Sequence, residues 1–386
     1  MRPVPRERTI ELSARELRGR RANGRTAFVL WGPLIQEQLL RDYGREGLCL
    51  KVWKRQLVGS LEEAYWGHGG SGGGLIVECA QIQNIAAMYD LAPRVYDVVR
   101  VQFNGEVHAG QVVEYASEKK PAKGAPLPTL DPLREKLTLN TWDGDFRRAN
   151  WRGGRLIDFE RERFASADIE QYDRYDKERQ KCFDHGAEYE AGLVARALKG
   201  HKRAYQAVPE LGIPGRRNLA HRVEAHRLGE VDFRGKSVLD LGCNLGVFSR
   251  YAWDRGAKRV VGVDVKQAEL AYEVSNRLNY WNLDFLTLAL PREAGRIAEE
   301  TGIGRFDVVI CFAMIRRAGG FAKGGGLKPW MDALVGDVLC LESHDTNDVE
   351  KSAAGWRRLL AGQFREVEFL GRVKDDRRRF GFRCKR

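Results

Sequence analysis

The chain has 386 residues, a length that suggests two domains, and its 43% of hydrophobic residues is enough for substantial cores. The formal net charge of +12 favours anionic partners such as nucleic acid, nucleotide phosphates, acidic glycans or anionic membrane surfaces. The longest apolar run is far shorter than the roughly 20 residues that span a bilayer, so no membrane span is expected.

The N-terminus is basic but has no apolar stretch after it, which argues against a secretory signal peptide. None of the seven cysteines forms a C-x-x-C pair, and several fall in apolar, strand-like runs. We interpret them as buried thiols in a reducing, cytoplasmic setting, with no disulfide framework and no zinc site. They are Cys49, Cys79, Cys182, Cys243, Cys311, Cys340 and Cys384.

The composition changes along the chain predict four parts. Residues 1–25 are expected to form a polar, helix-prone arm, and residues 26–200 an α+β domain. Residues 201–235 are expected to be lead-in helices or a linker. From 236 to 386 strands and helices alternate regularly, which predicts a mostly parallel sheet with helices on both faces. Glycine- and proline-rich stretches at 67–74 and 119–128 are typical of flexible connectors.

In the N-terminal half, the segment DGDFRRANWRGGRLIDFERERF at 143–164 has Asp145, Asn150 and, after a short apolar strand, Asp158. This spacing resembles the catalytic core of the protein-kinase-like fold, especially its aminoglycoside and choline kinase branch. The resemblance implies that Asp145 orients an attacking hydroxyl. It also implies that Asn150 and Asp158 hold magnesium on the phosphates of ATP.

The same resemblance requires an upstream lysine and glutamate in this chain order. Residues 48–54 are expected to form a strand carrying Lys51, which would bind ATP phosphate, and residues 75–90 a helix carrying its partner Glu78. Two further strands are expected at 91–102 and 108–117. Asp143 stands where that branch has histidine, and no glycine-rich loop precedes Lys51. An inactive pseudokinase and an unrelated α+β accessory domain therefore remain alternatives.

The C-terminal half begins with KSVLDLGCNLGVFSRYA at 236–252, which predicts a short strand, a glycine turn and a helix. Glycines there let the backbone approach a ligand closely, and the helix N-terminus is expected to offer free amides. A second strand, RVVGVDV at 259–265, places Asp264 near its end, where an acid can accept both hydroxyls of a ribose.

The glycine spacing is not the G-x-G-x-x-G of dinucleotide folds. It resembles the first motif of class I S-adenosylmethionine (SAM)-dependent methyltransferases, and the resemblance covers roughly residues 216–386. It implies a Rossmann-like, mostly parallel seven-stranded sheet, with a fourth strand at 306–315, a fifth at 338–344, and a reversed final hairpin. The residues implied to bind SAM are Asp240, Gly242, Cys243, Asn244, Gly246, Asp264 and Phe312.

Other residues of this half are candidates for the acceptor side. Glu342 and His344 lie at the predicted end of the fifth strand and are candidate bases for a hydroxyl acceptor. Arg217 and Arg222 are candidates to meet the SAM carboxylate or a substrate anion. Ala289 stands where many family members have an acid near the adenine, which leaves that contact open.

The sequence therefore predicts a SAM-dependent methyltransferase acting on a small-molecule or glycan acceptor. Its kinase-like domain is expected to bind ATP and Mg, or to phosphorylate a substrate of the same pathway. One alternative is a methyltransferase with a non-catalytic pseudokinase domain that recognises substrate. Another is an RNA or tRNA methyltransferase with a basic binding surface. The sequence indicates neither the atom that is methylated nor the oligomeric state.

Overall fold

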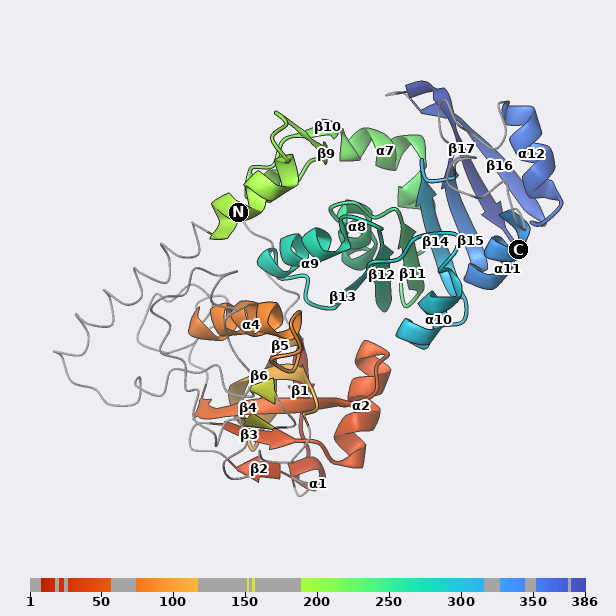
Figure 1. The fold of residues 1–386 in the computed structure, drawn as a ribbon. Coiled ribbons are helices and arrows are strands. Elements are labelled where there is room, and N and C mark those ends of the chain that lie inside the picture. The colour runs from red at the N-terminus through yellow and green to blue at the C-terminus, as the bar shows by residue number, and fades with distance from the viewer. Residues whose placement is uncertain are drawn as a thin grey trace. The chain divides into compact units, whose positions relative to one another are not determined.

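The structure is a computed structural model, and it describes residues 8–17, 21–23, 27–56, 74–116, 151–152, 155–156, 189–315, 327–343, 352–373 and 376–386. The chain divides into two compact units (Figure 1). The first unit comprises Met1–Gly192 together with Asn276–Trp281, and the second comprises Leu193–Ser275 together with Asn282–Arg386. The lead-in segment, which we define as residues 204–226, thus belongs to the second unit.

The first unit is built on a six-stranded sheet in the order β1-β5-β6-β4-β3-β2. Neighbouring strands are antiparallel, except that β1 runs parallel to β5. The strands are β1 (Thr9–Glu11), β2 (Arg21–Asn23), β3 (Ala27–Leu30), β4 (Leu48–Gln56), β5 (Val95–Phe103) and β6 (Glu106–Glu114). The remaining elements are α1 (Ala14–Leu17), α2 (Pro33–Tyr43), α4 (Gly74–Ala87), β7 (Trp151–Arg152) and β8 (Arg155–Leu156). The predicted α+β character and the predicted strand–helix–strand–strand order are confirmed.

Helices α2 and α4 pack against opposite faces of this sheet. On β4, Leu48 and Leu50 cluster with the buried side chains of α2, whereas Cys49 clusters with those of α4. Successive side chains of a strand point to opposite faces. Lys51 therefore lies on the α4 face of the sheet, as its predicted pairing with a glutamate of that helix requires.

The predicted polar arm at residues 1–25 contributes a strand to this sheet. Ile10 of β1 pairs with Val101 of β5 and is 3% exposed, while its neighbours Thr9 and Glu11 are exposed. A single buried isoleucine between polar residues is too short a pattern to predict a strand. The free edge of β5 supplies the hydrogen bonds that make it one.

The second unit contains a seven-stranded sheet in the order β13-β12-β11-β14-β15-β17-β16. The first five strands in this order are parallel, and β17 runs antiparallel between β15 and β16. The strands are β11 (Ser237–Leu241), β12 (Arg259–Val263), β13 (Leu283–Leu286), β14 (Phe306–Phe312), β15 (Val335–Glu342), β16 (Glu366–Val373) and β17 (Asp376–Lys385). The predicted mostly parallel sheet with a reversed final hairpin is confirmed.

Helices and short strands surround this sheet. They are α7 (Leu219–Ala225), α8 (Val247–Asp254), α9 (Ala268–Arg277), α10 (Gly295–Thr301), α11 (Leu327–Leu334) and α12 (Ala353–Ala361), with β9 (Ala204–Gln206), β10 (Gly215–Arg217), η3 (Pro209–Leu211) and η4 (Leu228–Glu230). Residues 189–198 are also helical. No helix among the described residues is long and apolar enough to cross a membrane.

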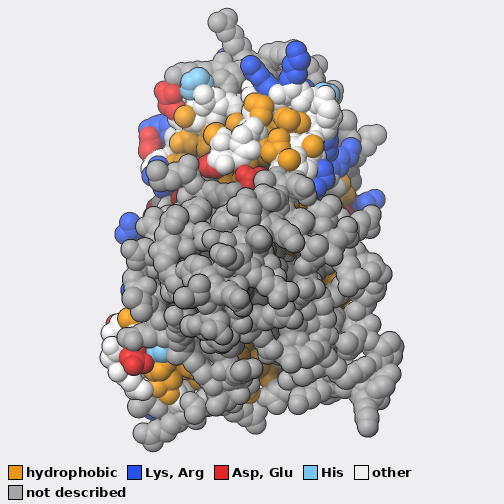
Figure 2. All heavy atoms as spheres, turned by 90° about the vertical axis from the view of Figure 1, so that its left-hand side faces the viewer, with side chains coloured by type: hydrophobic (Ala, Val, Ile, Leu, Met, Phe, Trp, Pro, Cys, Tyr) orange, Lys and Arg blue, Asp and Glu red, His pale blue; other side chains and the backbone are white. Residues whose placement is uncertain are grey.

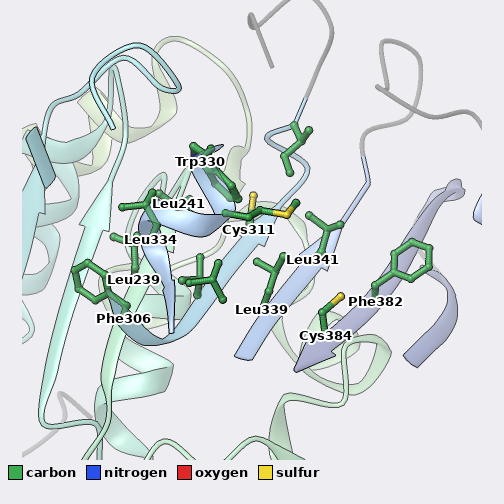
Figure 3. Packing of buried hydrophobic residues seen from close by; sticks show 14 of the residues in the cluster. Leu239, Leu241, Phe306, Cys311, Trp330, Leu334, Leu339, Leu341, Phe382 and Cys384 are labelled. Carbon is green, nitrogen blue, oxygen red and sulfur yellow. The ribbon is translucent and has the colours of Figure 1, made fainter. Parts of the chain in front are cut away.

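The core of the second unit explains why the sequences of its strands are continuous apolar runs. Trp330 and Leu334 of α11 belong to one buried cluster with Leu239 of β11, Leu341 of β15 and Phe382 of β17 (Figure 3). Parallel strands covered on both faces bury every side chain, so their sequences do not alternate. This core holds the carboxyl ends of β11, β12, β14 and β15 at one edge, where ligands of open α/β sheets bind.

The five cysteines whose side chains the structure describes are buried and are free thiols. Burial raises the pKa of the Cys49 and Cys340 thiols to about 12, so that almost no reactive thiolate is present at neutral pH. This agrees with the interpretation of these residues as packing thiols. The five are Cys49, Cys243, Cys311, Cys340 and Cys384.

Candidate active site

The turn between β11 and α8 depends on glycine, as the sequence predicts. Gly242 and Gly246 have φ values of 72° and 73°, in the left-handed region that favours glycine. A Cβ atom at Gly246 would also lie 2.9 Å from the ring of Phe285. The loop 242–246, called the glycine loop below, therefore keeps its shape only with glycine at these positions.

The amides at the start of α8 are not free, contrary to the expectation from the sequence. The side-chain oxygen of Gln206 accepts hydrogen bonds from the backbone N–H of Leu245 (3.1 Å) and of Val247 (3.3 Å). Gln206 lies in β9 and is itself buried. A residue 39 positions before Leu245 thus caps the helix whose N-terminal amides are expected from the sequence to be free.

The other amides of the glycine loop also have partners within the chain. Gly242 and Cys243 donate to the carbonyl oxygen of Val263 at 2.8 and 3.1 Å. Asn244 donates to Asp264 Oδ2 at 3.1 Å, and the N–H of Gly246 donates to the carbonyl of Cys243 at 2.9 Å. Every backbone N–H from residue 242 to 247 is therefore hydrogen-bonded within the protein.

Replacement of Gln206 by alanine is expected to destabilise the second unit by about 2 kcal/mol, because two buried N–H groups lose their acceptor. Denaturant unfolding of Gln206→Ala against the wild type measures this loss. Glu210→Ala, an exposed position in η3, is the control and should change stability by less than about 0.5 kcal/mol. Equal stability of both variants would show that water or another side chain replaces the Gln206 cap.

Asp264 lies at the end of β12, where the sequence places it. Its Oδ2 accepts the hydrogen bond from Asn244, and its Oδ1 accepts from the N–H of Lys266 (2.9 Å) and Gln267 (3.0 Å). A carboxylate has about four acceptor sites, so at least one remains for a ligand hydroxyl. The next residue, Val265, is 53% exposed and presents an apolar surface beside it.

Asp240 is buried beneath the glycine loop at the end of β11. Its Oδ2 accepts a hydrogen bond from Ser249 Oγ at 2.7 Å, and burial raises the pKa of its carboxyl group to about 6. Because the folded state holds this proton more tightly than the unfolded chain does, the carboxyl favours folding most at low pH. Its contribution is lost as the pH rises from about 4 to about 6.

As the pH rises from about 4 to about 7, the wild type is therefore expected to lose about 3 kcal/mol of stability that the variant Asp240→Asn does not lose. Denaturant unfolding of both proteins at the two pH values gives this difference. A constant stability difference across the range would mean that Asp240 titrates normally in the folded protein.

The sequence left open which acidic residue lies near the adenine of the cofactor, and Asp284 does not supply it. This residue of β13 forms an ion pair with Arg259 of β12 at 3.5 Å, so its carboxyl group is engaged at the start of the strand. After the strand, the Glu293 carboxylate accepts a hydrogen bond from the N–H of Ala289 at 2.7 Å. The carboxylate of a residue four positions later thus lies at the backbone of Ala289.

At the end of β15, Glu342 is completely buried among three donors. Its Oε2 accepts from Arg222 Nη2 (2.5 Å) and His226 Nε2 (2.7 Å), and its Oε1 accepts from Arg379 Nη1 (2.8 Å). Although burial alone would raise the pKa of Glu342, the hydrogen bond from His226 and the charge of Arg222 hold it well below the usual value. Burial lowers the pKa of His226, which favours the neutral ring.

This geometry does not favour Glu342 as a general base, although the residue lies where the sequence predicts. A base needs to reach a substrate proton and to have a pKa near the working pH. Glu342 is inaccessible to solvent, and its carboxylate is occupied by charged donors. Two of these donors, Arg222 and Arg379, are themselves buried, so the group forms a buried ion-pair cluster. The second base predicted from sequence, His344, lies outside the described residues.

Phe312, the last residue of β14, contacts side chains of both the lead-in segment and α8. His226 stacks on its ring at 4.0 Å, and Phe248 of α8 meets it edge-on at 4.9 Å. The guanidinium of Arg222 lies 5.5 Å from the centres of both phenylalanine rings. The lead-in segment is therefore packed against the carboxyl ends of β14 and β15.

The structure brings the predicted SAM residues Asp240, Gly242, Cys243, Asn244, Gly246, Asp264 and Phe312 to one edge of the sheet. Cys243 contributes its backbone there, because its side chain is buried against Gly262. In the first unit, Glu78 belongs to α4, but its side chain is not among those described. Asp145, Asn150 and Asp158 also lie outside the described residues, so the magnesium site stays a prediction.

Comparisons with known proteins bear on the second unit. Residues 219–316, from α7 to just after β14, match the sequence model of the FtsJ-like methyltransferase family. The second unit has the class I methyltransferase fold. Its mostly parallel seven-stranded sheet, its glycine loop and Asp264 are the features of that fold which the sequence predicted. We call it the methyltransferase unit below.

Curated relatives match a short part of the chain. The ubiquinone biosynthesis O-methyltransferases of Pseudomonas paraeruginosa and Pseudomonas aeruginosa are 35% identical over 100 residues, or 25% of this chain. The match spans only 40% of those relatives. The activity of the whole chain is therefore a matter of proposal.

Solved structures with similar folds include the bifunctional kinase-methyltransferase WbdD, with a TM-score of 0.37 and 19% identity over 50% of this chain and 45% of that one. They also include the SAM-bound magnesium protoporphyrin IX methyltransferase of Synechocystis. It has a TM-score of 0.33 and 19% identity over 43% of this chain and 76% of that one.

Proposed function

We propose that the methyltransferase unit binds SAM and transfers its methyl group to a small-molecule or glycan acceptor. The observation that carries this proposal is Asp264, a carboxylate held by three backbone amides at the end of β12 with an acceptor site left over. A ribose that donates its hydroxyls to a charged acceptor gains strong hydrogen bonds there.

The neighbouring residues fit the rest of the cofactor. The exposed side chain of Val265 offers an apolar surface for the adenine ring next to the ribose position. The side-chain oxygen of Asn244 is buried and has no hydrogen-bond partner within the described part of the chain. A buried acceptor without a donor is costly, so a donor supplied by a ligand, such as an ammonium group, would stabilise it.

Methyl transfer requires little acid or base catalysis from the protein. When SAM is bound, its sulfonium supplies an electrophilic methyl group, and the chain needs mainly to align the acceptor and exclude water. Arg222, His226 and Phe312 pack together at the carboxyl ends of β14 and β15 and are buried there. This packing fixes the strand ends beside which an acceptor would lie.

Two observations support a small acceptor. The first is the sequence match of this chain to ubiquinone biosynthesis O-methyltransferases over 100 residues. In addition, the lysine and arginine side chains on the described part of one face lie among acidic, apolar and other side chains rather than in one continuous band (Figure 2). Binding to RNA would instead weaken steeply with salt, because phosphate contacts release counterions.

Titration of the full chain with S-adenosylhomocysteine (SAH), the demethylated product of SAM, tests the proposal. Saturable binding in a one-to-one ratio is expected. If the wild type fails to bind SAH and SAM under conditions where it is folded, the proposal is wrong.

A nucleotide site in the first unit is a second candidate function, favoured by Lys51 on the α4 face of the sheet. Its Nζ lies 5.3 Å from the ring centre of Trp53, on the same face of β4. We expect Mg-ATP to bind the full chain, and Lys51→Met to weaken binding at least about tenfold through loss of a phosphate contact. Calorimetric titration measures both, with the exposed Lys199→Met as the charge-matched control.

The outcome also separates the alternatives for this domain. Phosphoryl transfer from bound ATP would support a kinase, and binding without turnover a pseudokinase. Binding of SAH without any binding of ATP would support an accessory domain that recognises substrate.

A further inference from the structure

The first unit contains a short stretch of chain that is far from the rest of the unit in sequence. Residues Asn276–Trp281 belong to this unit, although the residues on both sides of them belong to the second unit. The stretch begins with the last two residues of α9 and ends before β13. We call it the returning segment. The chain therefore comes back to the first unit after it has formed the glycine loop and Asp264.

Trp281, the last residue of the returning segment, is part of the core that α4 forms with the sheet of the first unit. It is 3% exposed and belongs to one buried cluster with Ala80 of α4 and Cys49 of β4. Cys49 lies two residues before Lys51 on the same strand, so the side chains of both lie on the α4 face of the sheet. The returning segment thus contributes to the core on the face that carries Lys51.

Gln81 of α4 is hydrogen-bonded to the returning segment at three points. Its Nε2 donates to Asn279 Oδ1 at 2.7 Å, its Oε1 accepts from Arg277 Nη1 at 2.9 Å, and its backbone carbonyl accepts from Asn276 Nδ2 at 3.0 Å. Gln81 is 8% exposed. Hydrogen bonds between buried groups resist displacement, because breaking them leaves polar atoms without a partner. The segment therefore holds α4 at this point along the helix.

A second residue of α4, Asn84, joins the helix both to the sheet and to the returning segment. Its Nδ2 donates to the carbonyl oxygen of Val95 at 3.0 Å and to Asn276 Oδ1 at 3.3 Å. Its Oδ1 accepts from the backbone N–H of Val95 at 2.7 Å, and the residue is 1% exposed. Two buried residues of α4 thus bind the segment, and one of them also binds the first residue of β5.

The helix that the returning segment holds is the one that carries Glu78. Gln81 comes three residues after Glu78, which is less than one helical turn, so a displacement of the helix at Gln81 moves Glu78 with it. In kinase-like sites, the position of this helix decides whether its glutamate pairs with the phosphate-binding lysine. Contacts made at Gln81 therefore bear on the predicted pairing of Glu78 with Lys51.

We propose that the returning segment positions α4 for the nucleotide site of the first unit, with Asn276, Arg277 and Asn279 as its positioning residues. They hold the helix where Glu78 supports Lys51 against the phosphates of a nucleoside triphosphate. The inference rests on the second candidate function, the nucleotide site. Methyltransferase sequence encloses the segment on both sides, so a single break in the chain cannot separate a complete nucleotide site from the methyltransferase unit.

Gln81→Ala in the full chain tests the proposal. It removes the side-chain hydrogen bonds to Arg277 and Asn279, and alanine is compatible with the helix. The matched control is Gln83→Ala. Gln83 is also buried in α4, but its Nε2 donates to the carbonyl oxygen of Pro93 at 2.7 Å, outside the returning segment. Calorimetric titration with Mg-ATP and with SAH is made for each protein.

Gln81→Ala should weaken Mg-ATP binding at least about threefold and leave SAH affinity within about twofold. Gln83→Ala should leave both affinities within about twofold. In protein that already carries Lys51→Met, adding Gln81→Ala should cost no more than about twofold, because the helix acts through the lysine. General destabilisation would not produce this dependence on Lys51.

A second variant covers the case in which Gln81→Ala does not fold. Asn279 has a φ of 64°, which glycine adopts readily, so Asn279→Gly removes the acceptor of the Gln81 hydrogen bond without backbone strain. It should weaken Mg-ATP binding in the same direction and show the same dependence on Lys51.

The proposal is overturned if Gln81→Ala leaves Mg-ATP affinity unchanged, or if Gln83→Ala weakens it equally. It is also overturned if Gln81→Ala weakens Mg-ATP by the same factor with and without Lys51. A wild type that binds SAH but not Mg-ATP would contradict the nucleotide site itself, and the positioning role with it. A wild type that binds Mg-ATP separates the two, because only the positioning role then depends on the variants.

Discussion

Glu342→Ala is expected to destabilise the methyltransferase unit by about 3–5 kcal/mol, because it leaves the buried guanidinium groups of Arg222 and Arg379 without their shared carboxylate. The cost comes mainly from the unpaired charges that stay buried, more than from the loss of packing. Denaturant unfolding followed by tryptophan fluorescence measures the change.

Glu368→Ala is the matched control for this prediction. Glu368, on β16, also accepts hydrogen bonds from two arginines, Arg227 and Arg383, but its side chain is 40% exposed. Exposed ion pairs contribute little, so this variant should cost less than about 1 kcal/mol. If both variants cost the same, the buried arginines relax to solvent when their partner is removed, and the cluster is not rigid.

The pH dependence of Glu342 is opposite to that of Asp240. Because the folded pKa of Glu342 is held below its ordinary value, its stabilising effect is present at neutral pH and is lost as the pH falls below the ordinary value of about 4. The two buried carboxyls thus have opposite effects at acid pH. The difference arises because Glu342 is hydrogen-bonded to two arginines, whereas the groups that hydrogen-bond to Asp240 are the hydroxyl and the backbone of Ser249, which carry no charge.

Asp264→Ala is expected to weaken SAH binding by at least about tenfold, because the ribose loses a charged acceptor and Asn244 N–H loses the partner that holds the glycine loop. Calorimetric titration of the full chain measures the affinity. Asp264→Asn keeps one side-chain oxygen for the loop amide and should have an intermediate effect.

Asp337→Ala provides the control for Asp264. Asp337 is an exposed aspartate of β15 that pairs with Lys236, before the carboxyl end of its strand. Its replacement should leave SAH affinity within about twofold. An unchanged affinity in Asp264→Ala, with normal binding by the wild type, would remove Asp264 from the cofactor site.

Local patterns in the sequence were sufficient to predict a parallel sheet with helices on both faces and the position of Asp264, whereas the reversed final hairpin was implied by the family resemblance. Apolar runs such as residues 306–312 predict buried parallel strands, since both faces of such strands are covered. The glycine turn and the acid at the end of the next strand lie close together along the chain, so their relation is visible in one strand–helix–strand unit. In the first unit, strand and helix patterns likewise placed Lys51 on a strand ahead of α4.

The sequence also identified Glu342, Arg217 and Arg222 as notable residues, but it did not determine their roles. Glu342 was predicted to be a base, because nothing near it in the sequence shows that three donors surround it. Arg222 is 120 residues from Glu342, and Arg379 is 37 residues from it. Only the packing of α7 and β17 against the end of β15 brings them together.

The same reason explains the helix cap of α8. The amides at its N-terminus were expected to be free, since no residue adjacent in sequence caps them, yet Gln206 reaches them from β9. The sequence by itself determined the strands, the turns and the acids at strand ends, because short-range hydrophobic patterns and glycine conformations dictate them. The tertiary structure decided which polar groups are already paired and which remain for a ligand, because hydrogen bonds between distant segments form only when the chain packs.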